Sequence, residues 1–340
     1  MLGGFLALLS AATFALNNAS VRRGVLTGTV IQAMAITVPL GVPISFLVAL
    51  ATGSLAPVAE FSTQSLVILS LTGVVHFIWG RYCNYRATQA LGANLVAPIQ
   101  QVNLVISLAL AIWILGEVLT PLRLLGIALI FLGPSLTYEK KKARRSAPVA
   151  EQPAPDAIAA IDVRKPAAFV PNYAEGYLFA LLSATGYGVT PIMVRIGLEG
   201  KGLGVSIAGN FVASLAATIM MALILLWPGN TRHVLKIEPE AAKWFTFSGV
   251  LVCFSQIFLY MAMSIAPVTV VSPISRLSIL FRLYFSRLIN PHHEQFGGRI
   301  IVGTIVSLLG ALILSLSTDL VLANVPLPDV LVSILRWQWP

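Results

Sequence analysis

The chain has 340 residues, of which 57% are hydrophobic and only 10% are charged, with a net charge of +9 and a mean hydropathy of +0.86. So little charge over this length excludes a soluble domain and indicates a membrane protein with several spans. The positive charge does not indicate nucleic-acid binding, because Lys and Arg lie mostly between predicted spans or near their ends. Cys83 and Cys253 both fall inside predicted spans, so neither a disulfide framework nor a zinc site is expected.

Ten apolar stretches are long enough to cross a bilayer as helices, which predicts an all-α polytopic membrane protein. The first stretch is interpreted as a helix and not as a cleaved signal peptide, because no basic region precedes it and it has the length of a span. A basic and then Pro/Ala-rich linker at 139–172 divides the ten into two fives. The tail at 319–340 is broken by prolines and is predicted to lie at the membrane interface. The predicted spans are 2–20, 30–52, 64–88, 93–115, 119–138, 174–197, 203–227, 243–266, 268–290 and 297–317.

The two halves of the chain repeat one pattern. Residues 7–11 (ALLSA) recur at 180–184, and Pro98 of the fourth span recurs as Pro273 of the ninth. Five spans per repeat is an odd number, so the second repeat (173–318) must be inserted upside down relative to the first (1–138). Inverted repeats of this kind are typical of secondary transporters, whose substrate path lies at the repeat interface. The repeat continues in the fifth and tenth spans, where Glu117, Gly126 and Gly133 match Glu294, Gly303 and Gly310.

These residues resemble the drug/metabolite transporter superfamily, in particular its ten-helix type with two EamA domains. The resemblance rests on Ala90-Leu91, Pro98, Gly116-Glu117 and the glycines of the fifth span, in that order, and it covers nearly the whole chain. The second half has His293-Glu294 where the family pattern has Gly-Glu. The resemblance implies a carrier of metabolites, amino acids, nucleotide-linked compounds or cationic drugs. It also implies a central cavity that opens alternately to each side.

Two symmetry-related spans carry polar faces inside the predicted bilayer. On a helical wheel of the fourth span, Gln100, Asn103 and Ser107 share one side, and Gln101 lies beside them. The opposite side is predicted to face lipid and consists of Val102, Ile106, Ala109 and Trp113. In the ninth span, the corresponding polar face includes Ser275, Arg276 and Arg282, together with Ser272 and Ser286.

Arg276 lies close to the centre of the ninth span, where a charged side chain costs about 2.5–3.5 kcal/mol on insertion scales. None of the predicted spans has an Asp or Glu at its middle. We therefore expect Arg276 to contact an anionic group of the solute. The alternative is that backbone carbonyls and the amides of Gln101 or Asn103 satisfy it.

Three further polar residues are candidates for the same substrate site. Asn17 in the first span and Thr190 in the sixth lie on faces of small and polar residues, which equally fit close helix packing. His76 lies mid-span in the third helix and fits either proton transfer or a structural hydrogen bond. Glu117 and Glu294 fall at turns and are interpreted as helix-capping or gate-pairing residues.

The sequence favours a secondary-active transporter of a small organic solute that works by alternating access. Because embedded arginines outnumber embedded carboxylates, we expect an anionic or zwitterionic metabolite such as an amino acid, with a lipid or lipid-linked-precursor flippase as the alternative. No catalytic, nucleotide-binding, metal or cofactor motif occurs, so an enzyme is not expected. The expected partners are the solute and the bilayer of a plasma (inner) membrane. Coupling to a proton or to an exchanged solute, and a homodimer, are left open.

The distribution of charge also predicts an orientation. Most of the 22 Lys and Arg residues fall in the loops on the side away from the termini, including the linker. The positive-inside rule therefore places both termini outside. The family resemblance implies termini in the cytoplasm instead.

Overall fold

The computed structural model describes residues 2–115, 119–137, 170–198, 203–265, 271 and 274–315, together with isolated positions of the tail. Several predictions lie outside the described residues: Gly116-Glu117, Pro273, the linker up to residue 169 and most of the tail at 319–340.

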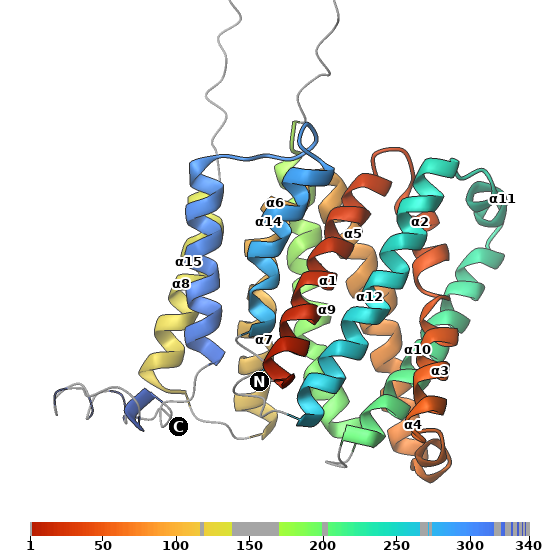
Figure 1. Cartoon of the computed structure of the whole chain (residues 1–340), viewed down its shortest axis with the longest axis horizontal. Helices are drawn as coiled ribbons and strands as arrows, with labels where there is room; N and C mark the ends of the chain where they lie inside the picture. The colour runs from red at the N-terminus through yellow and green to blue at the C-terminus, as the bar shows by residue number, and fades with distance from the viewer. Residues whose placement is uncertain are drawn as a thin grey trace, which may run out of the picture.

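The first repeat forms five helical spans, three of which consist of more than one helical segment (Figure 1). The first span is α1 and the fifth is α8, while η1 (Ala56–Glu60) is a short turn of helix in a loop. The segments of the five spans are α1 (Leu2–Gly24); α2 (Val30–Thr37) with α3 (Gly41–Ala51); α4 (Thr63–Gly73), η2 (Val74–Gly80) and α5 (Arg81–Leu91); α6 (Ala93–Gln100) with α7 (Val102–Leu115); and α8 (Pro121–Thr137).

The second repeat follows the same plan with longer uninterrupted helices. Among the described residues, seven helical stretches of the chain are long and apolar enough to cross a membrane, and α8 and α15 are shorter apolar helices. With the segment around α14, these elements give the expected polytopic helical bundle. The helices of the second repeat are α9 (Tyr173–Gly197), α10 (Leu203–Leu226), α11 (Asn230–Leu235), α12 (Pro239–Ile265), α14 (Ser278–Ile289) and α15 (Gly298–Ser315).

The packing of the helices follows an approximate two-fold relation between the repeats. The first helix of each repeat packs against the third and fourth spans of the other: α1 against α12 and α14, and α9 against α5 and α7. The second spans meet each other through α3 and α10, and the fifth spans through α8 and α15. Figure 1 shows α8 and α15 side by side at one edge of the bundle. This exchange of partners is what an inverted repeat requires.

Glycines allow the two fifth spans to approach closely. A Cβ at Gly126 would lie 2.9 Å from the backbone oxygen of Gly310, and a Cβ at Gly133 would lie 2.5 Å from that of Gly303. Gly126 therefore faces Gly310, the repeat counterpart of Gly133, and Gly133 faces Gly303, the repeat counterpart of Gly126. A two-fold axis between the two helices produces this pairing. Small residues at a crossing let backbones touch and are a common means of packing helices in lipid.

Several predicted spans differ from the helices of the structure. The first helix does not end before Arg22 but continues to Gly24, so that Arg22 lies within it and is 1% exposed. The second span is interrupted between Thr37 and Gly41, at Pro39, where the sequence predicts a kink, because proline cannot donate to the helical ladder and its ring clashes with the preceding turn.

The fourth span is also interrupted, which alters its predicted polar and lipid faces. It breaks at Gln101, within one turn of Pro98, so one continuous wheel does not describe it. Val102, predicted to face lipid, is only 8% exposed and packs in a cluster with Ile130 and Ala184, whereas Trp113 is 83% exposed as expected.

Candidate solute cavity and closed face

A cavity of about 460 Å³ lies between the two repeats. The first repeat contributes α3 and the junction of η2 with α5, and the second contributes α10 and α12. The lining follows α3 from Gly41 to Ala51 and reaches Thr52 and Ser54 beyond its end. The polar and charged side chains in the lining are Thr37, Ser45, Thr52, Ser54, Arg81, Asn210, Ser214, Cys253 and Gln256.

A second cavity of about 260 Å³ lies next to the first, between η2, α9, α10 and α12. Both cavities are lined by Phe77, Asn210 and Gln256, so these side chains stand between the two lobes. His76 and Thr190 line the second lobe, and His76 Nδ1 lies 3.3 Å from Thr190 Oγ1. These two sequence-predicted residues therefore meet at a cavity wall.

The structure places Arg81 at the wall of the larger cavity. Its side chain is 8% exposed, its Nη1 donates to the backbone oxygen of Thr37 over 3.1 Å, and its guanidinium lies 5.0 Å from the centre of the Phe77 ring. No carboxylate occurs among the described residues that line either cavity. A guanidinium with donors to spare in a largely apolar cavity is suited to binding a carboxylate or another anion.

The sequence contains a signal for these cavity residues. Arg81 is embedded in a span as Arg276 is, and Asn210 and Gln256 are the amide side chains of α10 and α12. The third span also contains the π-helical segment η2, which carries His76 and ends next to Arg81. Such segments are frequent at functional sites, but hydropathy does not reveal them.

Gln100 and Arg282 meet across the repeat interface. Arg282 Nη1 donates to Gln100 Oε1 over 3.3 Å, and Gln100 Nε2 donates to Asn84 Oδ1 over 2.7 Å. The three residues are between 4% and 7% exposed. In this conformation two hydrogen bonds join them, while the buried Arg282 Nε has no partner, and they do not line either cavity.

The remaining candidates also lie away from both cavities. Asn17 Oδ1 accepts a hydrogen bond of 2.6 Å from Ser248 Oγ, which joins α1 to α12. Ser275 Oγ donates to the backbone oxygen of Val271 over 2.8 Å. Three buried atoms of these candidates have no hydrogen-bond partner: Gln101 Oε1, Asn103 Oδ1 and Arg276 Nε. Their predicted contact with solute stays a prediction.

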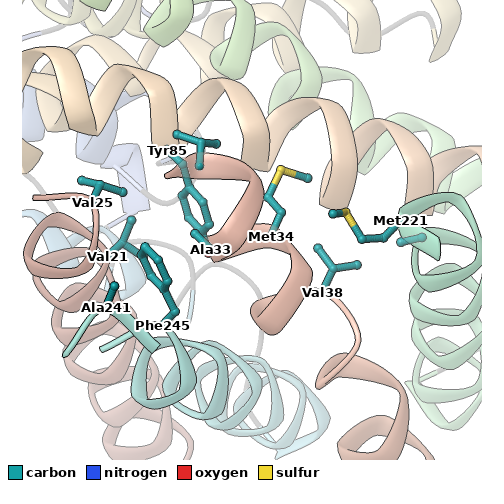
Figure 2. Close-up of a cluster of buried hydrophobic side chains, with 11 residues drawn as sticks. Val21, Val25, Ala33, Met34, Val38, Tyr85, Met221, Ala241 and Phe245 are labelled. Atoms are coloured by element: carbon teal, nitrogen blue, oxygen red, sulfur yellow. The ribbon is translucent and has the colours of Figure 1, made fainter. Parts of the chain in front are cut away.

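An apolar cluster, drawn in Figure 2, packs around the end of α1, at the opposite end of the bundle from the end of α3 (Figure 1). It brings together residues of α1, α2, α5, α10 and α12, with Phe245 and Tyr85 among them. Phe245 packs so closely on the end of α1 that a Cβ at Gly24 would lie 2.3 Å from its ring. The buried members are Val21, Val25, Val30, Ala33, Met34, Val38, Tyr85, Ala217, Met221, Ala241 and Phe245.

A polar cluster closes the same end beside the apolar one. Glu294, between α14 and α15, accepts hydrogen bonds from the backbone N–H groups of Ala93 (2.5 Å) and Asn94 (3.2 Å), and Arg22 Nε lies 3.6 Å from its Oε1. Glu294 therefore caps α6 of the other repeat, in agreement with the predicted capping role. Burial raises the pKa of Glu294 to about 7, because it outweighs the opposing effects of Arg22 and the two N–H groups.

Helical spans in two inverted repeats with a cavity between the repeats define a membrane transporter. The chain belongs to the EamA-like transporter family, whose model matches residues 1–138 and 174–316. It is thus an integral, multi-pass membrane protein and a transporter of the drug/metabolite type.

No curated protein matches the chain. A solved structure titled "Crystal structure of protein" is 17% identical, with 92% of this chain and 94% of that chain covered and a TM-score of 0.45. A likeness this low adds nothing to the family assignment.

Proposed function

We propose that this transporter is a secondary carrier that moves a small anionic or zwitterionic organic solute, such as an amino acid, by alternating access. The observation that carries the proposal is the cavity between the repeats, which has Arg81 in its wall and no carboxylate among its described lining residues. An uncompensated cation in an apolar site favours a solute that brings a negative group. The apolar walls along α3 accommodate the rest of the solute.

Alternating access requires one face to be sealed while the other is reached by the site. The cavity lining extends to Thr52 and Ser54 at one end of the bundle, whereas Phe245 and the Arg22–Glu294 pair lie at the other. This arrangement supports a carrier in a one-side-open conformation. Rocking of the repeats about the fixed site would then expose it to the opposite side.

The proposal is tested with the purified protein in liposomes. Uptake is measured for radiolabelled leucine, phenylalanine and glutamate, with tetraphenylphosphonium as a cationic comparison and a fluorescent phospholipid to detect flipping. We expect saturable uptake of at least one amino acid. Saturable transport of tetraphenylphosphonium or flipping of the phospholipid, without amino acid uptake, would contradict the proposal.

Replacement of Arg81 by Gln tests the assigned anchor. Loss of a charge-assisted hydrogen bond to a carboxylate costs about 1.5–3 kcal/mol, so we expect KM for the transported amino acid to rise about 10- to 150-fold. Arg276→Gln serves as the comparison, because that residue carries the sequence-based prediction. A larger rise in KM for Arg276→Gln than for Arg81→Gln would show that Arg276 of the ninth span, and not Arg81, binds the anionic group of the solute.

A further inference from the structure

Arg22, Glu294 and the start of α6 tie three separate chain segments together at the sealed end. Arg22 Nη2 donates to the backbone oxygen of His293 over 2.6 Å, and its Nη1 donates to those of Thr88 and Gln89 over 3.1 and 3.0 Å. Two side-chain amides extend the same junction. Asn290 Nδ2 donates to Ala19 O over 2.8 Å, and Asn94 Nδ2 donates to Gln295 O over 3.2 Å.

Glu294 is the buried carboxylate among the described residues, since Glu60, Glu238 and Glu240 are exposed and Glu175 is partly exposed. Its side chain has 0% exposure. It fits against Gly92, whose φ is +83° and where a Cβ would lie 2.5 Å from Glu294 Oε2. The loop between α5 and α6 is thus shaped to receive this carboxyl group.

The cation beside Glu294 neutralises it only in part. Arg22 directs its N–H groups at three backbone oxygens, and its Nε is 3.6 Å from the carboxylate, longer than a hydrogen bond. Removing a carboxylate from water is costly unless it is fully paired. If the sealed end opens, the loop carrying Glu294 leaves α1 and α6 and the carboxylate becomes hydrated, so this cost exists in the closed state alone.

We propose that Glu294 is a proton-binding site that links closure of this face to proton uptake: the face closes as Glu294 takes up a proton and opens as it releases one. The proposal rests on the alternating access of the proposed function and adds a proton to its conformational step. The charged groups that act on Glu294 are Arg22 of α1 and Arg282 of α14. Arg22, Arg23 and His292 act on His293, the residue next to it in the same loop.

The direction of the pH dependence follows from linkage. The pKa of the Glu294 carboxyl is about 7 in the closed state, above its ordinary value of 4.5, so the closed state binds the proton more tightly than a hydrated open state does. Closure is therefore favoured fully below pH 4.5, and this advantage is lost as the pH rises through 7. The closed-to-open ratio changes by up to about tenfold per pH unit within that window.

The test measures opening directly and needs no solute. In a Cys83→Ala, Cys253→Ala background, Val25→Cys places a reporter in the apolar cluster, where Val25 is 4% exposed. Its labelling by a hydrophilic maleimide in nanodiscs is compared with that of Lys236→Cys, an exposed position, to correct for thiol ionisation. We expect the ratio of labelling rates to rise between pH 5 and pH 7 and then level off.

Substitutions of Glu294 and Arg22 test whether the pH dependence of labelling arises from this pair. Glu294→Gln imitates the protonated carboxyl and should give slow labelling with no pH step. Arg22→Gln removes the charge that opposes protonation and should move the midpoint to higher pH. Glu175→Gln, which removes the partly exposed pair with Arg86, is the matched control and should leave the wild-type step unchanged.

A flat wild-type profile, or an unchanged step in Glu294→Gln, would overturn the proton site. Because labelling is read without solute, its outcome is separable from the transport assays. If Arg81→Gln leaves amino acid uptake unchanged while the Glu294-dependent step persists, the solute assignment fails and the proton site stands. If the step is absent while Arg81→Gln raises KM, the reverse holds.

Discussion

At the scale of single residues, the polar side chains inside the spans differ in which groups complete their hydrogen bonds. Asn17 bonds to Ser248, and Gln100 bonds to Asn84 and Arg282, so protein atoms already fill these roles. A buried amide in lipid is costly without such a partner.

Arg81 differs from these amides because it stands in a cavity wall and makes one hydrogen bond to a backbone oxygen there. A guanidinium carries five N–H donors, so it has capacity for a ligand.

Gly92 gives a prediction at the same scale. Replacement by Ala would place a Cβ against Glu294 in a backbone conformation that side chains rarely adopt. We expect Gly92→Ala to lower the free energy of unfolding by more than Gly53→Ala, which has a positive φ of 67° but nothing within 4 Å of its Cβ position. The control should lose about 1–3 kcal/mol from backbone strain alone. Denaturation in detergent micelles measures both, and equal losses would show that the fit of Glu294 to Gly92 contributes nothing.

At the scale of elements, interruptions and close crossings position the functional groups. The break after Thr37 leaves its backbone oxygen free to accept from Arg81, and the π-helical η2 precedes that same arginine. Proline explains why the second span breaks, because it cannot donate to the helical ladder. Where a helix lacks part of its ladder of backbone hydrogen bonds, some carbonyl oxygens have no partner within the helix. Such oxygens are tolerated inside a membrane where they line a cavity.

The crossing of α8 and α15 gives a second prediction. A Cβ at Gly310 would lie 2.8 Å from both Gly126 O and Ile130 N, and backbone atoms cannot move aside as a flexible side chain can. Gly310→Ala should therefore destabilise the protein by about 1–3 kcal/mol through overpacking. Gly298→Ala in the same helix, with nothing within 4 Å of its Cβ position, should have no cost. Thermal unfolding of the two variants in parallel checks this, and equal melting temperatures would contradict close packing of the fifth spans.

At the scale of the whole molecule, the structure is asymmetric along the axis of its helices. One end is sealed by Phe245 and the Arg22–Glu294 pair, and the cavity lining reaches the other end at Ser54. Which end faces the cytoplasm follows from charge and not from packing.

Orientation gives the third prediction. The excess of Lys and Arg in the loops away from the termini places that side in the cytoplasm, so both termini should lie outside. Reporter fusions at each terminus, one active only in the cytoplasm and one only outside, would measure this. Cytoplasmic activity at both ends would reverse the orientation and make the cavity inward-facing.

The sequence by itself determined the membrane class, the inverted repeats and the family. Hydropathy and motif spacing record where each residue stands along a span, and a bilayer imposes the same length and polarity on every span. Tertiary structure decided which embedded polar groups meet an open cavity. In the sequence, Arg81 and Arg276 look alike, because each is an arginine embedded in a predicted span. Only helix packing places Arg81 at a cavity wall. Packing likewise gave Glu294 its partners, because the start of α6 lies about 200 residues away along the chain and is brought near by the inverted pairing of the repeats.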